Sequence, residues 1–383
     1  MHSFRLNRFF PVRLLLTLLL TLLLPLLISG CGEAKYILRY KQPSEQQIWP
    51  NPPDKPRYRY VGQLTGQNNL KLVEEGGAGK AVIKFLKAVV GLGSGSDAEK
   101  RMLHRPQCGI VDNTGRILVT DVGRASIFVF DPNKGKLDIW QEADDKYDFK
   151  MPVGIAQTKN GDILVADSAL KRIIRLDVNG KPRGSFGAED LERPTGLAVD
   201  PATGRIFVTD TVENNIKVYD ENEKLIQIIG QLGTKGGEFN APTHIAYKNN
   251  HLYVTDTFNA RIQMFDSKGK FVRSIGNRGQ YIGNLVRPKG VTADSEGNVY
   301  IIESFNDYLL IYDKNARFLL PIGGTGAKVG QFYLPAGVWS DHQDRIYVAD
   351  MYNGRVVIFQ YLQGKGTGGS DTNQHSLTTA PGS

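Results

Sequence analysis

The most regular feature of the sequence is a short apolar run that ends in a carboxylate and recurs along the chain. The six carboxylates are Asp121, Asp167, Asp210, Asp256, Glu303 and Asp350. Successive members are separated by 46, 43, 46, 47 and 47 residues. Self-similarity at a period of this size is the signature of a repeat architecture. The pattern therefore predicts six copies of one structural unit.

Each copy contains three further runs of β-forming residues around the one that ends in the carboxylate. A copy opens with proline and has glycine or a substitute two residues later. The opening prolines are Pro106, Pro152, Pro194, Pro242, Pro288 and Pro335. A third run, such as residues 261–266, and a more polar fourth run, such as residues 271–276, follow the carboxylate. Four short runs bounded by Gly, Asn, Asp and Pro predict a four-stranded antiparallel sheet, so we expect an all-β, six-bladed β-propeller.

The residues after the carboxylates resemble the NHL repeat, whose unit runs Pro-x-Gly, strand, Asp-Thr-x-Asn-x-Arg, strand ending in Asp, then Gly. Residues 256–261 match the central motif in full, and residues 350–355 match all but one position. Asp167 is followed by Arg172 at the same spacing, whereas the other three copies lack the arginine. The resemblance covers roughly residues 105–361 and implies the propeller fold. It implies no single activity, because propellers host unrelated functions.

The recurring carboxylate and arginine are expected to pair across the turn between two strands. Six equivalent catalytic dyads in one molecule would make no chemical sense, whereas a structural contact is naturally repeated in every blade. We therefore assign these residues to the fold and not to catalysis.

The sixth copy lacks an outer strand, and the N-terminal part of the chain contains a candidate for it. Residues 58–66 are similar to residues 225–233, an outer strand of the third copy. A strand from this segment would complete the last blade and remove an open sheet edge that invites aggregation. The sequence thus predicts one closed, monomeric ring over residues 58–363. It contains the repeats at 105–361 and an insertion at 67–104.

The N-terminus indicates export. Residues 1–30 carry three arginines and no acid, and the apolar stretch at 14–28 is short for a spanning helix but fits a signal-peptide core. The sequence before Cys31 resembles the lipobox of bacterial lipoproteins, which implies lipidation of Cys31 and a membrane anchor in the cell envelope. Gly32 in place of Asp implies the outer rather than the inner membrane. The alternative is an ordinary signal peptide, or an anchor, with a chance cysteine.

Three segments outside the repeats have their own character. Residues 31–57 are rich in proline and are predicted to form a lipid-anchored tether, and residues 364–383 are predicted to be a disordered tail. Within the insertion, residues 78–90 predict a helix with lysines on one stripe. It has two interpretations: a cap on one end of the propeller, or a basic amphipathic element that touches the membrane or a partner.

Charge and cysteine content limit the function classes. The formal net charge of +8 falls to +5 without the three signal-peptide arginines, which gives no argument for nucleic-acid binding. An extracytoplasmic location excludes that partner as well. With Cys31 acylated, Cys108 has no intramolecular disulfide partner, and two cysteines provide no Cys-x-x-Cys-His haem attachment.

Two substitutions of the glycine in the Pro-x-Gly openings suggest metal chemistry at first sight. Cys108 replaces it in the first copy and His244 in the fourth, and these copies lie opposite each other in a six-fold ring. Both side chains are thus placed to face the central channel as a zinc pair. Ligands of one zinc ion must lie within about 4 Å of each other, however, and opposite channel walls are further apart. We expect no metal site here.

The position directly after the opening proline is the second place for chemistry. It holds Gln107, Val153, Thr195, Thr243, Lys289 and Ala336. The peptidyl-hydroxyglycine lyases, which are similar propellers, place histidines there as zinc ligands, and this sequence has none. We therefore predict no catalytic residue and no cofactor.

The sequence favours a membrane-anchored, extracytoplasmic propeller that acts as a binding or scaffold module for a protein partner. The candidate binding mouth comprises Gln107, Cys108, Thr195, Thr243, His244 and Lys289. The alternative is a propeller enzyme, either a metal-dependent lyase or a lactonase-like hydrolase, with a divergent central site.

Overall fold

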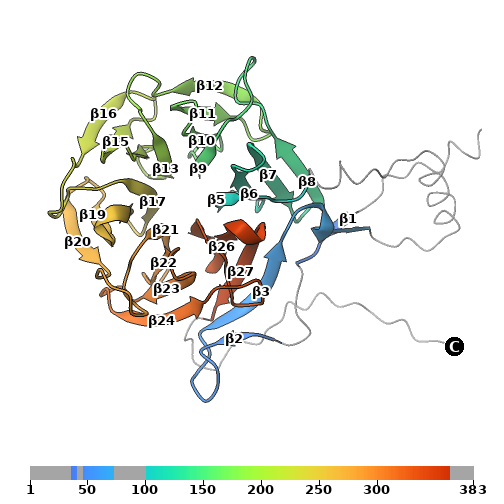
Figure 1. Ribbon diagram of the computed structural model, residues 1–383. Coiled ribbons are helices and arrows are strands. Elements are labelled where there is room, and N and C mark those ends of the chain that lie inside the picture. The colour runs from blue at the N-terminus through green and yellow to red at the C-terminus, as the bar shows by residue number, and fades with distance from the viewer. Residues whose placement is uncertain (1–35, 41–45, 73–100, 363–383) are drawn as a thin grey trace, which may run out of the picture.

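The chain folds into a ring of six antiparallel sheets around a central axis (Figure 1). The computed structural model describes residues 36–40, 46–72 and 101–362. In blades one to five the first strand lies nearest the axis and the last forms the outer edge (Figure 1). The predicted all-β, six-bladed propeller with four-stranded blades is confirmed.

Each of the first five blades is a continuous stretch of chain. Blade one contains β5 (Pro106–Val111), β6 (Ile117–Asp121), β7 (Ser126–Asp131) and β8 (Lys136–Trp140). Blade two contains β9 (Pro152–Gln157), β10 (Ile163–Asp167), β11 (Arg172–Leu176) and β12 (Pro182–Phe186). Blade three contains β13 (Pro194–Val199), β14 (Ile206–Asp210), β15 (Asn215–Tyr219) and β16 (Leu225–Ile229). Blade four contains β17 (Pro242–Lys248), β18 (His251–Asp256), β19 (Arg261–Asp266) and β20 (Phe271–Ile275). Blade five contains β21 (Pro288–Ala293), β22 (Val299–Glu303), β23 (Tyr308–Tyr312) and β24 (Phe318–Gly323).

The sixth blade joins the two ends of the described chain. It contains β25 (Val338–Ser340), β26 (Arg345–Asp350), β27 (Arg355–Tyr361) and, as its fourth strand, β3 (Tyr58–Leu64). β3 pairs antiparallel with β27, from Val356 opposite Leu64 to Tyr361 opposite Tyr58. This strand therefore lies where the sequence predicts residues 58–66 to close the ring.

The hydrophobic core is divided among the six interfaces between neighbouring blades. One cluster contains Leu118 and Phe149 between blades one and two, and another joins Trp339 of blade six to Val119 of blade one. The strands that end in the carboxylates are buried along their whole length, because each is flanked by two strands and two neighbouring blades. This explains why they read as continuous apolar runs instead of alternating ones.

Hydroxyl groups link neighbouring blades in a way that the sequence analysis did not identify. The Thr120 hydroxyl donates to the Val153 carbonyl (2.8 Å), and the Thr209 and Thr255 hydroxyls donate to the carbonyls of Thr243 and Lys289 in the following blade. These threonines all directly precede a repeat carboxylate. Each bond satisfies a backbone carbonyl beside the channel and fixes one blade relative to the next.

The segment predicted to be a free tether packs on the propeller over part of its length. β2 (Ile48–Trp49) extends the sixth blade beyond β3, and the Trp49 ring contacts Phe359 edge-on at 5.4 Å. β1 (Tyr36–Leu38) pairs with β4 (Leu70–Leu72). The proline-rich composition concealed a few large apolar residues that pair with an otherwise open strand edge. The expectation of a spacer over all of 31–57 is thus corrected.

The insertion begins differently from its prediction. Residues Gln67–Asn69 form a 3-10 turn, η1, which leads into β4. Two further 3-10 turns, η2 (Thr257–Asn259) and η3 (Met351–Asn353), follow the carboxylates of blades four and six. The predicted helix at 78–90, the predicted lipidation site Cys31 and the predicted tail at 364–383 lie outside the described residues. Within the described residues, no helix has the length and apolar character needed to span a membrane.

Candidate binding face around the channel mouth

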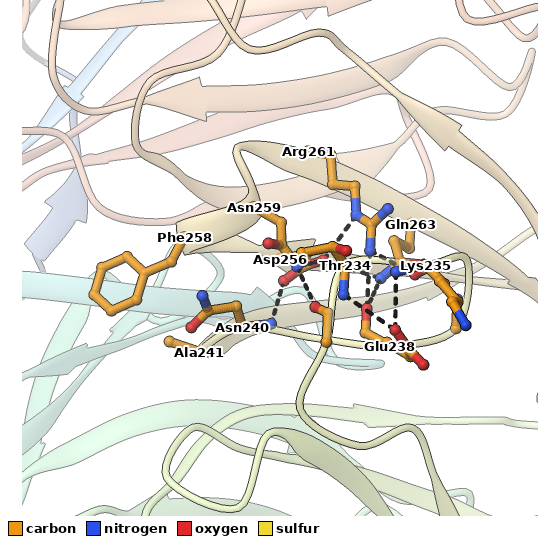
Figure 2. A network of polar contacts seen from close by, with 12 residues as sticks. Thr234, Lys235, Glu238, Asn240, Ala241, Asp256, Phe258, Asn259, Arg261 and Gln263 are labelled. Atoms are coloured by element: carbon orange, nitrogen blue, oxygen red, sulfur yellow. Dashed lines mark hydrogen bonds and ion pairs between the residues drawn. The ribbon is translucent and has the colours of Figure 1, made fainter.

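The repeat carboxylates tie together the turns that surround one end of the channel. Asp256 accepts hydrogen bonds from the backbone N–H of Asn240 (2.7 Å) and from the side chains of Asn259 (2.8 Å), Arg261 (2.8 Å) and Gln263 (3.0 Å) (Figure 2). The Asn240 bond joins the connection that enters blade four to the turn after β18. The fully buried carboxylate thus has its lone pairs occupied by the fold.

The predicted carboxylate–arginine pair forms in two of the three blades that have the arginine. Asp256 pairs with Arg261 at 2.8 Å, and Asp350 pairs with Arg355 at 2.7 Å. In blade two the expectation is wrong, because Arg172 lies 3.9 Å from Asp144 instead of pairing with Asp167.

In blade two, Asp167 accepts backbone N–H groups in place of the arginine. Its donors include Lys150 and Met151 before the blade and Ala169 after the strand. Asp121, Asp210 and Glu303 are likewise held by backbone N–H groups. Backbone amides can therefore replace the arginine side chain in this structural role.

A pair of arginine variants distinguishes a repeat carboxylate that is paired with arginine from one that is held by backbone N–H groups alone. Arg261→Met should lower the free energy of unfolding by about 2–3 kcal/mol, because the buried Asp256 loses a charged hydrogen-bond donor. The matched control, Arg172→Met, should cost less than about 1 kcal/mol, since its partner is distant and half exposed. Chemical denaturation of both variants measures the difference. Equal costs would show that the Asp256 contact adds nothing to the stability of its blade.

A side chain at the glycine position, two residues after each opening proline, would point toward the next blade rather than into the channel. A β-carbon at Gly337 would lie 2.1 Å from the carbonyl oxygen of Gln107, and one at Gly290 would lie 2.5 Å from the amide nitrogen of Val338. Both contacts are with the following blade. Only glycine fits where these backbones approach so closely.

This orientation separates Cys108 from His244. Cys108 packs against the apolar cluster between blades one and two, where burial raises the pKa of its thiol to about 11. His244 lies in the fourth blade on the side of blade five, and its Nδ1 is 3.1 Å from the Thr243 hydroxyl. Cys108 therefore packs between blades one and two, whereas His244 lies beside Lys289, so the two side chains do not form a pair across the channel.

The residues directly after the opening prolines surround the channel mouth. The Thr195 hydroxyl is 2.8 Å from that of Thr211, the Thr243 hydroxyl is 2.8 Å from that of Thr257, and the Gln107 amide donates to the Met351 sulfur at 2.8 Å. Most of the predicted mouth residues thus meet at one end of the ring. Cys108 is the exception, because it is engaged between blades.

Positive charge gathers at this mouth. Burial lowers the pKa of Lys289, and the positive charges of Arg287 and Arg105 lower it further. Burial also lowers the pKa of His244 to about 3, and the charge of Lys289 adds to the effect. We refer to Arg105, Arg287 and Lys289, together with the neutral imidazole of His244, as the cationic mouth. The arginines were missed in the sequence, although arginine directly precedes the opening proline in three copies.

Exposed apolar side chains flank the cationic mouth. The second residue after the carboxylate is Val212, Phe258, Phe305 and Tyr352 in blades three to six, and these side chains are 54%, 62%, 54% and 52% exposed. We call these four residues the apolar arc. The opening proline pairs with the carboxylate in blades three to five, so the arc lies on the same face of the ring as the openings.

The arc and the mouth are in direct contact. Figure 2 shows Phe258 pointing away from the Asp256 network that holds its turn. The guanidinium of Arg105 lies 5.6 Å from the centre of the Tyr352 ring, which is itself 5.5 Å from the ring of Tyr333. We call the surface formed by the cationic mouth, the apolar arc and the openings the opening face. The equivalent arc positions in blades one and two are Gly123 and Ala169, so the apolar surface covers one side of the face.

The opening face carries cationic and polar side chains that can bind a ligand, and they are not arranged as a metal centre. In residues 36–40, 46–72 and 101–362, no group of three His, Cys, Asp or Glu side chains is arranged to hold a metal ion. The Nε2 atom of His244 is buried and has no hydrogen-bond partner. A lysine, two arginines and an unsatisfied imidazole can attract and orient a negatively charged group.

Comparison with known proteins agrees with the fold. A family model described as a 6-bladed beta-propeller matches residues 238–321. Peptidyl-glycine alpha-amidating monooxygenase from Mus musculus is 32% identical over 136 residues, which cover 32% of this chain and 14% of that protein. NHL-repeat-containing protein 4 from Homo sapiens is 32% identical over 77 residues, covering 20% of this chain and 61% of that protein. The chain thus spans less than two thirds of either relative.

Solved structures extend the similarity over most of the chain. Virginiamycin B lyase from Staphylococcus aureus superposes with a TM-score of 0.53 at 15% sequence identity, covering 86% of this chain and 99% of that one. At this identity the likeness concerns the fold alone. Together with the repeats and the strand topology, it establishes that this chain is a six-bladed β-propeller, part of which is similar to an NHL-repeat-containing protein.

Proposed function

We propose that this chain is a lipoprotein of the bacterial cell envelope whose propeller binds a protein partner through the opening face. The observation that carries the proposal is the apolar arc, in which four consecutive blades expose an apolar side chain at the same position. A turn on the surface of a stable ring has no structural need for phenylalanine. Exposed aromatic residues beside polar groups are typical of protein-binding surfaces.

The use of the repeat carboxylates supports binding over catalysis. Each accepts several hydrogen bonds from the turns around it, and those of blades four and six also hold an arginine. A general base or metal ligand needs free lone pairs directed at its substrate or ion. The carboxylates therefore hold the loops of the opening face in place, and the loops present the arc.

The membrane anchor is the part of the proposal that rests on the N-terminal sequence. Lipidation of Cys31 would hold the ring at the membrane, with the outer membrane favoured over the inner one. Cys31→Ser should yield a soluble or uncleaved precursor without attached acyl chains. Labelled palmitate incorporated equally by the Cys31→Ser and unchanged proteins would argue against the anchor.

Photocrosslinking in native membranes tests the binding face. A photoreactive residue at position 305, in the arc, should capture one defined protein band. The matched control is position 272, where Val272 is 47% exposed on the outer strand β20. Capture from position 272 without capture from position 305 would move the partner to the rim of the ring and overturn the proposal.

A further inference from the structure

We propose that the cationic mouth binds the carboxylate of an acidic residue in the partner polypeptide, while apolar residues on either side of it pack on the apolar arc. This inference rests on the proposed partner-binding function and adds the chemistry of the segment that is recognised. The occupant is therefore an acidic residue within an apolar stretch of polypeptide chain.

Positively charged residues of two blades converge beside the imidazole of His244. Arg287 and Lys289 flank the opening proline of blade five, Arg105 precedes that of blade one, and His244 extends from blade four toward blade five. Two arginines and one imidazole, from three blades, thus lie within electrostatic reach of Lys289. The fold gains nothing from placing them together, because like charges repel.

The charges of the cationic mouth lack a counter-charge among the described residues. Among the residues that the structure describes, neither Arg105, Arg287 nor Lys289 forms an ion pair with a carboxylate. The nearby repeat carboxylates Asp121 and Glu303 accept backbone N–H groups instead. A half-buried lysine that faces two arginines without an acid is stabilised when an anion arrives, because the anion removes the repulsion and supplies the missing hydrogen-bond acceptor.

The imidazole of His244, which interacts with Lys289, has an unsatisfied nitrogen. The Nε2 atom of His244 is buried without a hydrogen-bond partner, while Nδ1 lies beside the Thr243 hydroxyl. A carboxylate oxygen held by Lys289 would provide the acceptor that an Nε2–H group lacks. Buried polar atoms without a partner are costly, so a ligand that satisfies this one binds more tightly.

The arrangement fits an acidic polypeptide better than a nucleic acid. Nucleic acids present a phosphate at every nucleotide and are bound by cations spread along a track. Here the cations converge on one mouth, and the surface beside it carries the apolar arc. One carboxylate flanked by apolar side chains matches this pattern of charge and apolar area.

A pair of synthetic peptides tests the inference on the full mature chain. The probe is acetyl-Trp-Leu-Glu-Leu-Phe-amide, and its uncharged twin carries Gln in place of Glu. Both are titrated by calorimetry, and the His244 ring is followed by NMR. We expect the Glu peptide to bind at least tenfold more tightly than its twin and to shift the His244 signals. Lys289→Gln should remove the difference without lowering the melting temperature, and Phe258→Ser should weaken both peptides alike.

Three other outcomes would overturn the carboxylate site, and each can be told apart from failure of the partner-binding proposal. Equal affinities for the two peptides, with Phe258→Ser still weakening both, would refute the carboxylate site but keep the apolar arc as a binding surface. The absence of any His244 shift up to 10 mM Glu peptide would refute the site as well. A hexauridylate that displaces the Glu peptide and binds more tightly would assign the mouth to nucleic acid. Failure of the partner-binding proposal itself is seen separately, as a lack of capture from position 305.

Discussion

Removal of residues 57–66 is expected to unfold the whole ring and not only its sixth blade. This segment contains β3, whose Tyr58, Tyr60 and Leu64 are buried against blade six and its neighbours. Burial of three such side chains contributes about 6 kcal/mol at roughly 2 kcal/mol each. A whole domain is stable by only about 5–15 kcal/mol. The deletion also exposes the edge of β27, so we expect aggregation instead of a soluble, five-and-a-half-bladed protein.

Matched variants keep this prediction testable if the deletion cannot be purified. Leu64→Ala should cost about 2–5 kcal/mol, since Leu64 is fully buried in the cluster between blades six and one. Arg59→Ala changes an exposed residue of the same strand and should cost less than about 0.5 kcal/mol. A further control is deletion of residues 364–383, which include one leucine and no Phe, Trp or Tyr. Equal melting temperatures for the Leu64→Ala and Arg59→Ala proteins would contradict the closure by β3.

Loss of the apolar arc is expected to abolish partner binding without destabilising the propeller. The triple variant Phe258→Ser, Phe305→Ser and Tyr352→Ser should bind the partner at least 100-fold more weakly, because aromatic residues at a protein interface commonly contribute 2 kcal/mol or more each. Its melting temperature should remain close to that of the unchanged protein, since the three side chains are more than half exposed. Surface plasmon resonance with the protein captured from position 305 measures the affinities.

The control for the arc is an apolar patch of similar exposure on the rim. Ile226, Ile228 and Val272 are 50%, 53% and 47% exposed on the outer strands β16 and β20. Their triple serine variant should retain the affinity of the unchanged protein. A rim variant that loses binding as strongly as the arc variant would indicate that the partner responds to general apolar exposure and not to the opening face.

Much of the fold follows from the repeat alone, because a blade cannot bury its faces without neighbours on both sides. Six carboxylates at near-constant spacing predicted six blades, and the missing outer strand after Tyr361 pointed to residues 58–66. Docking of β2 was not predictable from composition, since the prolines around Ile48 and Trp49 favour an extended tether in the absence of a partner strand. The edge of β3 supplies that partner.

The positions of the candidate mouth residues were predicted in part, their role in binding stays a prediction, and the errors in position have a physical reason. Thr243 and Lys289, directly after their opening prolines, lie at the channel mouth, but Cys108 and His244 occupy the glycine position, whose side chain points to the following blade. Sequence spacing gives the position of a residue in its strand. It does not show which way the side chain points when the backbone of a neighbouring blade lies close to it. The apolar arc was missed for another reason: its residues occupy the variable position of the turn motif, where comparison of all six copies would have shown apolar side chains in four.

Arg172 shows that the spacing between aspartate and arginine does not by itself predict an ion pair. It follows Asp167 at the interval that pairs Asp256 with Arg261, yet Asp167 is held by backbone N–H groups and Arg172 turns to Asp144. In blade four the motif also contains Asn259, which donates to Asp256, whereas the equivalent residue in blade two is Leu170. An isolated arginine therefore does not predict the contact when the rest of the motif is absent.

Hydrogen–deuterium exchange with and without the captured partner tests the central claim that the opening face is the binding surface. We predict slower exchange at residues 210–215, 256–261, 303–308 and 350–355, which form the turns that present the arc, and at residues 287–290 beside the mouth. The outer strands β16, β20 and β24 and the turns at the opposite end of the ring, such as residues 112–116 and 294–298, should exchange unchanged. Protection confined to that opposite end or to the outer strands, with the arc turns unaffected, would contradict the account.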